Sequence, residues 1–552
     1  MRREITIAVE GCCHGMLDAI YEQLRVRERQ LGKRIDLLII CGDFQAVRNP
    51  SDLAAMSCPD KYKRLGGFFR YYNRARTAPI PTVFVGGNHE AGNHLRELYF
   101  GGWVAPNIFY MGHSGVVRFG SLRIAGISGI YKDFDYAKGY YERPPFRGHA
   151  RASMHHVRAY EAFKMLQVRR PLDIVVSHDW PVGIERFGDT EGLLRRKPFF
   201  RAEVERGELG SPVNAMLLER LRPAWWFSAH MHTRFEAEVA SGDTFFAGGW
   251  AGVAPYGGTA AVGQQQSTGA PRNEDEIRIG DSDSEDGGPA PAQRPRMALN
   301  LPPPKHTAAT ADPEDAPSPV KEPQPSSADQ PQPPSPEPAT LSDPRVPGRA
   351  TRFLALDKCL PRREFLETIT MTVDAPDDLP LQLEYDAEWL AILRLCTPHM
   401  PLDQASFVPP RHLLLPAEIS PHLPLFSDQV VDRETRWVGR NVMPHGPVYV
   451  PPNFVPVAPT PDPRTHDSVS FGMAAGGAHG GGGGRGGGGR GRGRGRGGHR
   501  GAGRPPYAQP GGHRQPQDAE WVGPPPHVVY PNPQTDEFCQ MVGINDPLTQ
   551  RR

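Results

Sequence analysis

The segment TVFVGGNHE (82–90) carries the clearest indication of the fold in this chain. Its β-branched and apolar half favours a strand, and the two glycines after it favour a turn. Asn88, His89 and Glu90 follow, so polar residues lie directly beyond the carboxyl end of the strand. The same order recurs in ITIAVEGCCHG (5–15). This pattern predicts a fold in which several strands deliver polar side chains to one edge.

Residues 1–254 have the sequence pattern of an α/β domain. Several apolar runs lack alternation, which is typical of strands covered on both faces, and amphipathic segments such as 17–31 lie between them. We therefore predict a layered α/β fold. The predicted strands are ITIAVEG (5–11), DLLIICGD (36–43), TVFVGGN (82–88), IFYMG (108–112), VVRFGSLRIAGISG (116–129), DIVVSHD (173–179), WWFSAH (225–230) and TFFAGG (244–249).

The composition divides the rest of the chain. The 60 Gly and 60 Pro far exceed ordinary globular usage, so the folded part must be shorter than the chain. Residues 255–347 are rich in Pro and acidic side chains, which predicts a disordered linker. We interpret 348–440 as a small C-terminal domain with a helix over 383–395, and 441–552 as a disordered Pro-rich and RGG-type tail. The apolar face of that helix would comprise Leu383, Trp389, Leu390 and Leu393.

Charge and cysteine usage narrow the class of protein. The formal net charge is +1, so affinity for nucleic acid would depend on local clusters. The seven cysteines are odd in number and lack paired spacing, which argues against a disulfide framework and favours a reducing compartment. No uncharged apolar run of about 18 residues occurs, so no membrane association is expected.

Five apolar runs each end in side chains that can bind a metal. In layered α/β folds the loops beyond the carboxyl ends of the strands form the ligand crevice, so distant residues can converge there. Histidine, Asp, Asn and Cys bind divalent transition metals through N, O and S atoms. One such His is more often structural, but five elements together favour a shared site. The candidates are Cys12, His14, Asp43, Asn88, His89, His178, His230 and His232.

The order of these elements resembles the calcineurin-like metallophosphoesterases, whose pattern runs D-x-H, G-D, G-N-H-[DE], H and G-H-x-H. Cys12 stands where that family has Asp, and Ala229 where it has Gly. The resemblance implies a β-sandwich flanked by helices, with two divalent metal ions bridged by Asp43. A thiolate shifts the first site toward Fe²⁺ or Zn²⁺, with Mn²⁺ able to substitute. The implied ligands are Cys12, His14, Asp43 and His232 for one ion, and Asp43, Asn88, His178 and His230 for the other.

Longer stretches resemble the lariat RNA debranching enzymes. They include VEGCCHGMLDAIY (9–21), CGDFQAVRN (41–49) and TRFLALDKCLPRREFLE (351–367), which is similar to the start of their C-terminal domain. The resemblance implies hydrolysis of the 2′,5′-phosphodiester at the branch point of excised intron lariat RNA, giving linear RNA for turnover. A metal-bound hydroxide would attack the phosphorus, and His89 would act as general acid toward the leaving 2′-oxygen.

A segment of interleaved aromatic and basic residues (131–160) suits such a substrate. Rings can stack on bases while Lys and Arg meet phosphates. We predict a loop, which in the resembled family is a lariat recognition loop; the alternative is a merely solvated, charged loop. His155 and His156 are expected on a solvated helical face, with RNA contact as the alternative. The predicted substrate contacts are Tyr131, Lys132, Tyr136, Lys138 and Arg158.

Two other functions stay open: a different metal-dependent phosphoesterase on the same scaffold, and a non-enzymatic RNA-binding adaptor. The RGG-type tail is expected either to add RNA contacts with little sequence preference or to act as a solubilising spacer. The expected location is the nucleus, where lariats arise, with shuttling to the cytoplasm as an alternative. The sequence identifies no protein partner.

Overall fold

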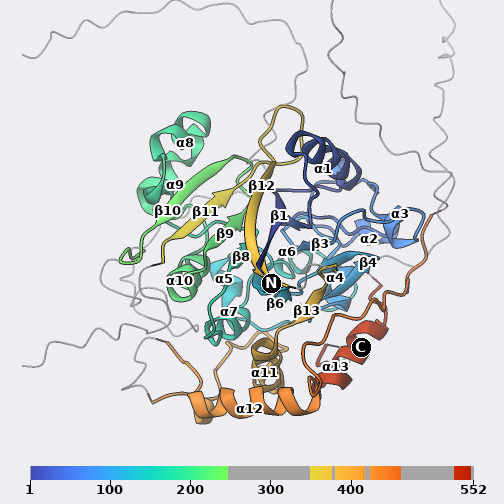
Figure 1. Cartoon of the computed structure of the whole chain (residues 1–552), viewed down its shortest axis with the longest axis vertical. Coiled ribbons are helices and arrows are strands. Elements are labelled where there is room, and N and C mark those ends of the chain that lie inside the picture. Colours follow the sequence, from blue (N-terminus) through green and yellow to red (C-terminus); the bar gives the residue numbers. More distant parts are fainter. Residues whose placement is uncertain (1, 246–348, 376–379, 417–422, 462–527, 549–552) are drawn as a thin grey trace, which may run out of the picture. The chain divides into compact units, whose positions relative to one another are not determined.

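The computed structural model describes residues 2–245, 349–375, 380–416, 423–461 and 528–548 (Figure 1). They belong to one compact unit formed by Met1–Arg272 together with Arg345–Arg552. The predicted linker (255–347) and the Gly–Arg stretch (476–504) lie outside the described residues, as does the predicted strand 244–249 beyond Phe245. Within the described ranges no helix has the length and apolar character needed to cross a membrane.

Six strands form the first sheet, in the spatial order β12 (Leu366–Asp374), β1 (Arg2–Glu10), β2 (Leu37–Ile40), β3 (Thr82–Phe84), β5 (Ile108–Tyr110) and β4 (Gly102–Ala105). The four strands β1, β2, β3 and β5 run parallel, so their carboxyl ends meet at one edge. The flanking strands β12 and β4 are antiparallel to their neighbours.

Seven strands form the second sheet, in the order β10 (Phe235–Val239), β11 (Thr351–Ala355), β9 (Trp225–Ser228), β8 (Ile174–Ser177), β7 (Leu122–Ile127), β6 (Ser114–Phe119) and β13 (Leu383–Tyr385). β7, β8, β9 and β11 run parallel. The predicted single strand 116–129 is a hairpin of β6 and β7. The chain reverses at Gly120, whose φ of 62° is readily adopted by glycine. The apolar residues on both sides of Gly120 give no indication of this turn in the sequence.

The main core lies between the two sheets. In β1, Ile5, Ile7 and Val9 face this core, while Ala8 faces the opposite side with the buried residues of α1 (Leu17–Leu31). This alternation follows from the two-residue period of a strand. Each such Ile or Val contributes about 1.5–3 kcal/mol relative to exposure. Two packed sheets with flanking helices confirm the predicted layered α/β fold (Figure 1).

The helices follow local signals. The predicted helix 17–31 has the same bounds in the structure and ends at Gly32, at a φ of 62°. The predicted helix 383–395 begins too early, because Asp386 caps α11 (Ala387–Cys396) by accepting the Trp389 N–H at 3.0 Å, and Leu383 lies in β13. Other helices are α2 (Pro50–Leu53), α3 (Phe69–Tyr72), α4 (Gly92–Glu97), α7 (Ala159–Leu166), α8 (Thr190–Arg196), α9 (Arg201–Arg206), α10 (Pro212–Leu221) and α12 (Asp428–Asn441).

The C-terminal domain predicted over 348–440 shares both sheets with the first domain. β11 lies between β10 and β9, and β12 pairs with β1 along all nine residues of β1 (Figure 1). Without these partners the strands formed by 1–254 would leave backbone N–H and C=O groups unpaired. The C-terminal strands therefore complete the fold that positions the polar residues.

Part of the predicted disordered tail (441–552) is helical. In α13 (Pro533–Val542) the ring of Phe538 stacks on Phe100, with ring centroids 5.7 Å apart. The Gln534 side chain accepts from Trp103 N and donates to Trp103 O, both at 2.9 Å. It therefore pairs with the edge strand β4 as another strand would. The Pro- and Gly-rich surroundings of this short helix conceal it in the sequence.

Candidate metal centre

The predicted metal ligands lie where parallel strands of the two sheets end. Because the carboxyl ends of neighbouring parallel strands share an edge, residues from both sheets can meet there. The first sheet positions Cys12 and His14 after β1, Asp43 after β2, and Asn88 with His89 after β3; the second positions His178 after β8, and His230 with His232 after β9. We call the seven predicted ligands the metal centre.

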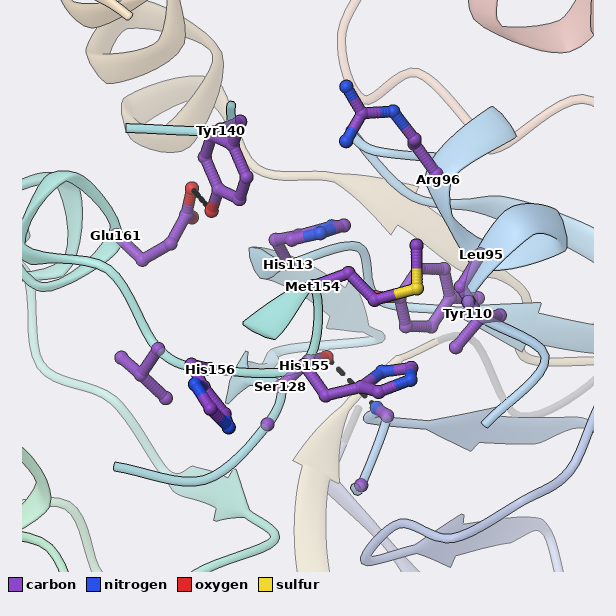
Figure 2. A pocket seen from close by; sticks show the side chains of 15 residues that line it. Leu95, Arg96, Tyr110, His113, Ser128, Tyr140, Met154, His155, His156 and Glu161 are labelled. Carbon is purple, nitrogen blue, oxygen red and sulfur yellow. Dashed lines mark hydrogen bonds between the residues drawn. The ribbon is translucent and has the colours of Figure 1, made fainter. Parts of the chain in front are cut away.

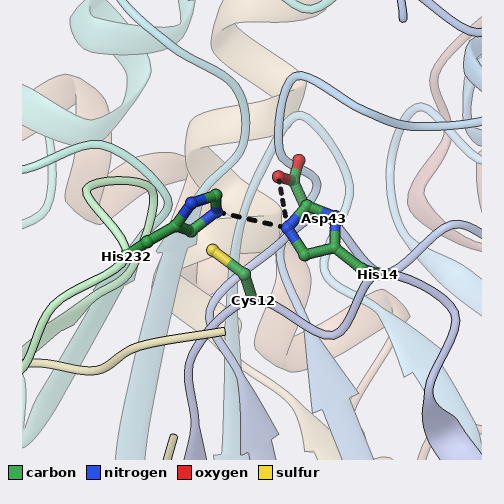
Figure 3. A group of neighbouring side chains, drawn as sticks. All are labelled: Cys12, His14, Asp43 and His232. Carbon is green, nitrogen blue, oxygen red and sulfur yellow. Dashed lines mark hydrogen bonds and ion pairs between the residues drawn. The ribbon is translucent and has the colours of Figure 1, made fainter. Parts of the chain in front are cut away.

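The first donor set is Cys12, His14, Asp43 and His232, whose ligand atoms all lie within 4.8 Å of one another (Figure 3). His14 Nε2 lies 3.2 Å from His232 Nε2 and 3.7 Å from Asp43 Oδ2. Bonds of about 2.05 Å in a tetrahedron place neighbouring nitrogens about 3.3 Å apart. The spacing of the two imidazoles therefore fits a shared cation.

The second donor set centres on His178. Its Nδ1 donates to the Cys41 carbonyl at 2.8 Å, which directs Nε2 toward the metal centre. That Nε2 lies 3.2 Å from Asn88 Oδ1 and 3.4 Å from Asp43 Oδ1, and the His230 ring lies 5.0 Å from the His178 ring. Asp43 thus presents one carboxylate oxygen to each donor set, which is the position of a bridging ligand.

Four residues of the metal centre have left-handed backbone conformations. Their φ angles are 45° at His14, 46° at Asp43, 61° at His230 and 46° at His232. This conformation costs about 1–2 kcal/mol per non-glycine residue, and such strain concentrates at functional sites. The surrounding fold therefore stabilises a geometry that these loops would not adopt alone.

Two glycines leave room for the ligands. A Cβ at Gly42 would lie 2.3 Å from His178 Nδ1, and one at Gly87 would lie 2.2 Å from Asp43 Oδ1. Both distances are far below van der Waals contact, so any side chain would displace a ligand. The glycines of the G-D and G-N-H motifs thus have a steric role.

Glu90 holds the two loops of the first sheet together. Its fully buried carboxylate accepts the N–H groups of Phe44 (2.7 Å), Gln45 (2.7 Å) and Gly87 (3.0 Å). These bonds fix the backbone directly after Asp43 and directly before Asn88. These contacts are with backbone N–H groups of both loops, so the positioning role of Glu90 is visible only in the folded chain.

Burial keeps three imidazoles in the form that binds metals. It lowers the pKa of His14 to about 4 and that of His230 to about 3, and it lowers the pKa of His232 as well. Burial alone would raise the pKa of Asp43, but the neighbouring imidazoles, His178 foremost, hold that pKa well below its usual value. Neutral imidazoles and an ionised carboxylate are the forms that ligate cations.

The Cys12 thiol is protonated in the metal-free protein and must lose its proton to bind a metal. Burial raises its pKa, the charge of Asp43 raises it further, and the His230 N–H, 3.2 Å from the sulfur, opposes the shift. A thiol that coordinates a metal is deprotonated. Metal binding at the first donor set is therefore coupled to loss of the Cys12 proton.

His89 faces the metal centre. Its backbone N–H donates to Asp43 Oδ1 at 2.9 Å, and its Nδ1 donates to the Ser57 carbonyl at 3.2 Å. Nε2 lies 3.2 Å from the Asn88 amide nitrogen, so the ring edge that can exchange a proton points along the ligand loop. The residue is partly exposed, which leaves it accessible to a substrate.

Lys358 is a positively charged neighbour that the sequence interpretation missed. It follows β11 and forms a parallel bridge with Cys12, and the next residue, Cys359, donates its N–H to Cys12 O at 3.1 Å. After burial, the charge of Lys358 is among the causes that lower the pKa of His14 and His232. The strand-end argument would have found it if 351–355 had been predicted as a strand.

Three of the predicted substrate contacts are partly exposed. Tyr131 donates its backbone N–H to Asp179 Oδ2 at 3.3 Å, next to the ligand His178, and Lys132 follows it. Lys138 forms an ion pair with Asp135 at 2.9 Å. These positions leave the predicted RNA contacts sterically open.

Tyr136 and Arg158 are buried, so neither side chain is open to a substrate in this structure. The Arg158 guanidinium pairs with Glu142 and donates to the Asp135 carbonyl at 2.7 Å. It also lies over the rings of Tyr140 and Tyr141, at 5.8 and 5.5 Å from their centroids. The interleaved aromatic and basic residues therefore partly satisfy one another inside the protein.

Residues 131–160, which we call the recognition segment, are not a simple loop. They contain α5 (Asp133–Tyr136), α6 (His149–Ser153) and the start of α7, and Ile130 forms a β-bridge with His156. His155 and His156 are buried, so their prediction on a solvated face is wrong. Histidine is polar in a sequence pattern yet is often buried in the folded chain, as His156 is with its Nδ1 2.7 Å from Asp135 Oδ2.

A pocket adjoins the loop that carries Asn88 (Figure 2). Gly86 and Gly87 line it together with His113 and His155. His113 Nδ1 and His155 Nε2 are buried and have no hydrogen-bond partner in the described part of the chain, and burial lowers the pKa of both imidazoles to about 3. The pocket therefore presents two neutral imidazoles beside the metal centre.

Two family models match the chain. The calcineurin-like phosphoesterase model matches residues 5–234, and the model of the lariat debranching enzyme C-terminal domain matches residues 348–471. The lariat debranching enzyme of Schizosaccharomyces pombe is 41% identical over 461 residues, which cover 82% of this chain and 89% of that protein. The chain belongs to the lariat debranching enzyme family.

Other lariat debranching enzymes match less of their own length. Lariat debranching enzyme A of Xenopus laevis is 40% identical over 388 residues, covering 70% of this chain and 54% of that protein. The Homo sapiens lariat debranching enzyme is 40% identical over 390 residues, covering 70% and 53%. The chain thus spans about half the length of these two relatives. The resemblance predicted from the motifs is confirmed.

Proposed function

We propose that this protein hydrolyses the 2′,5′-phosphodiester bond at the branch point of excised intron lariat RNA, giving linear RNA for turnover. The observation that carries the proposal is the position of Asp43, whose Oδ2 faces His14 and whose Oδ1 faces His178. A carboxylate between two donor sets suits a two-metal phosphodiesterase. The family to which the chain belongs supports branched RNA as the substrate.

Two divalent cations are the implied cofactors. Sulfur, nitrogen and oxygen donors in the first set favour Zn²⁺ or Fe²⁺ over Mg²⁺, and Mn²⁺ can substitute. Such a pair supplies a strong nucleophile from water near neutral pH and stabilises charge at the phosphorus. The ligands are those named for the two donor sets, with Asp43 shared.

The reaction adds water across the bond between phosphorus and the 2′-oxygen. That bond breaks, the phosphate remains on the former 5′ end, and the 2′-oxygen leaves with a proton. His89 delivers the proton from Nε2, while the Ser57 carbonyl holds its Nδ1–H. Glu90 keeps Asp43 and Asn88 in position by binding the backbone of both loops.

Positive and aromatic side chains around the metal centre would hold the RNA. Tyr131 and Lys132, at the start of the recognition segment, lie near Asp179, the residue after His178, and Lys138 lies further along the segment. Lys358 supplies a positive charge near the first donor set, where a phosphate oxygen would lie. The Gly–Arg stretch (476–504) would add RNA contacts without sequence preference. We place the reaction in the nucleus, where lariats form.

The test is cleavage of synthetic branched RNA by the purified full chain, with Fe²⁺ (under anaerobic conditions), Zn²⁺ and Mn²⁺ supplied separately. We expect release of linear RNA with a free 2′-hydroxyl, and no cleavage of linear RNA of matched sequence. Equal cleavage of both RNAs would indicate a general phosphodiesterase. Binding of branched RNA without cleavage under all three metals would indicate an RNA-binding adaptor.

A further inference from the structure

A second cluster of metal-binding side chains lies within the recognition segment. His149 Nε2 and His156 Nδ1 lie 2.8 and 2.7 Å from the same oxygen of Asp135, Oδ2. The ligand atoms of the three residues all lie within 4.8 Å of one another. We infer that Asp135, His149 and His156 bind one divalent transition-metal ion, in addition to the two ions of the metal centre.

The donor chemistry selects the kind of ion. Two imidazoles and one carboxylate form a three-ligand set that Zn²⁺ uses in open sites, and the same set accepts Fe²⁺ and Mn²⁺. Mg²⁺ and Ca²⁺ prefer oxygen donors and would bind poorly. The site therefore takes a transition metal and leaves at least one coordination position for water or a substrate oxygen.

The positions of the three residues suit coordination with a small adjustment. Asp135 on α5 and His156 at the β-bridge are buried, so two ligands are already ordered. The side chain of His149 on α6 is 49% exposed, so the third ligand can move. The nitrogens must separate from the carboxylate oxygen by about half an ångström to reach the tetrahedral spacing of about 3.3 Å. On coordination each neutral imidazole keeps its proton on the other ring nitrogen, Nδ1 of His149 and Nε2 of His156, so that the nitrogen facing Oδ2 can bind the ion.

The surrounding charges affect the affinity without blocking the site. Lys138 pairs with the other carboxylate oxygen, Oδ1, at 2.9 Å, and Arg158 lies 4.0 Å from that same oxygen. Both cations can therefore stay in place when Oδ2 binds a metal. Arg158 is also neutralised by Glu142. The remaining positive charge lowers the affinity, so this ion should dissociate more readily than those of the metal centre.

A metal at this site would join three parts of the recognition segment: α5, α6 and the residue that bridges to Ile130. The exposed ring of Phe134 lies beside both histidines, at centroid distances of 5.6 and 5.8 Å. The ion would therefore hold an aromatic surface and an open cation position next to each other, a combination suited to a nucleotide.

The experiment measures Zn²⁺ bound to the full chain by equilibrium dialysis and elemental analysis. The variants are His149→Ala, Cys12→Ser, and His445→Ala as a control that removes an exposed histidine elsewhere. We expect His149→Ala to bind one equivalent less than wild type, and His445→Ala to match wild type. The double variant Cys12→Ser/His149→Ala should bind one equivalent of Zn²⁺ less than Cys12→Ser alone. Equal Zn²⁺ content in wild type and His149→Ala would overturn the proposal.

Hydrogen exchange of α6 gives a second readout that does not require RNA cleavage. Zn²⁺ should slow exchange at His149–Ser153 in wild type and Cys12→Ser but not in His149→Ala. The same slowing in His149→Ala would also overturn the proposal. Because neither measurement uses activity, a failure here is distinct from a failure of the proposed hydrolysis.

Discussion

The metal centre and the recognition segment lie close together but are ordered by different means. In the metal centre, single residues at the ends of parallel strands converge, four of them in left-handed conformations, and steric room comes from glycines. In the recognition segment, short helices are held by side chains that bind one another, with Asp135 and Arg158 at the middle. The first arrangement depends on the sheets, the second on a local polar network.

This difference indicates how substitutions in each region should affect function. A displaced strand-end ligand removes chemistry outright, because each donor has one position on one rigid edge. A lost partner in the recognition segment loosens the surface that would hold RNA but leaves the ligands in place. Substitutions in the two regions should therefore separate turnover from substrate binding.

The largest effect is expected from Asp43→Ala. The carboxylate faces both donor sets, so its loss should remove both metals and abolish detectable cleavage of branched RNA. Metal content and single-turnover cleavage measure this. Retention of both ions would show that Asp43 does not bridge them.

His89→Ala should leave the metals bound and slow cleavage by about 10²–10⁴-fold, the usual contribution of a general acid. His89 is not a predicted ligand, so its loss should not release the metal ions. Its Nε2 lies 3.2 Å from the amide nitrogen of the ligand Asn88, close enough to the metal centre to serve a substrate there. A branched substrate with a better leaving group at the 2′ position should restore much of the rate. Full activity of His89→Ala on ordinary branched RNA would exclude it from proton transfer.

Gly87→Ala should reduce the turnover number by about 10²-fold, since a misplacement of about 1 Å at a reacting group has that effect. The new Cβ would meet Asp43 Oδ1 at 2.2 Å. Gly439→Ala is the matched control, because a Cβ there meets nothing within 4 Å. If both variants behave like wild type, the ligand loops are less rigid than their contacts indicate.

Arg158→Ala should raise the KM for branched RNA by about 10-fold, equivalent to about 1.4 kcal/mol, while the two ions of the metal centre stay bound. It should also destabilise the protein by about 3–5 kcal/mol, because it leaves Glu142 buried without its ion pair. Thermal unfolding and Michaelis kinetics measure the two effects. Loss of an ion from the metal centre in Arg158→Ala would mean that the two regions are not independent.

The smallest effect is a pH dependence. Burial would raise the pKa of Asp135, but hydrogen bonds from His156 and Lys138 hold it well below its usual value. A carboxyl with a lowered folded-state pKa contributes stability above its unfolded pKa of about 3.9 and loses it as the pH falls further. The difference in melting temperature between wild type and Asp135→Asn should therefore be present at pH 6 and shrink below about pH 4. A constant difference would exclude ionisation of Asp135 as its source.

The chemistry of the metal centre could be predicted from the amino-acid sequence alone. The identities, order and strand-end positions of Cys12, Asp43 and Asn88 are local features, and the parallel strands that carry them have a recognisable apolar pattern. Helix 17–31 was predictable for the same reason, since its periodicity and terminal Gly32 lie within one segment.

The partners of the other residues depend on how distant segments of the chain pack together. The pairing of β11 and β12 with strands far earlier in the chain, the position of Lys358 beside Cys12, and the contacts of Gln534 join residues hundreds of positions apart. Burial of Arg158 likewise depends on Glu142 and Asp135 closing around it. A sequence pattern records whether a residue is polar, but packing determines whether its partner is solvent, substrate or another side chain.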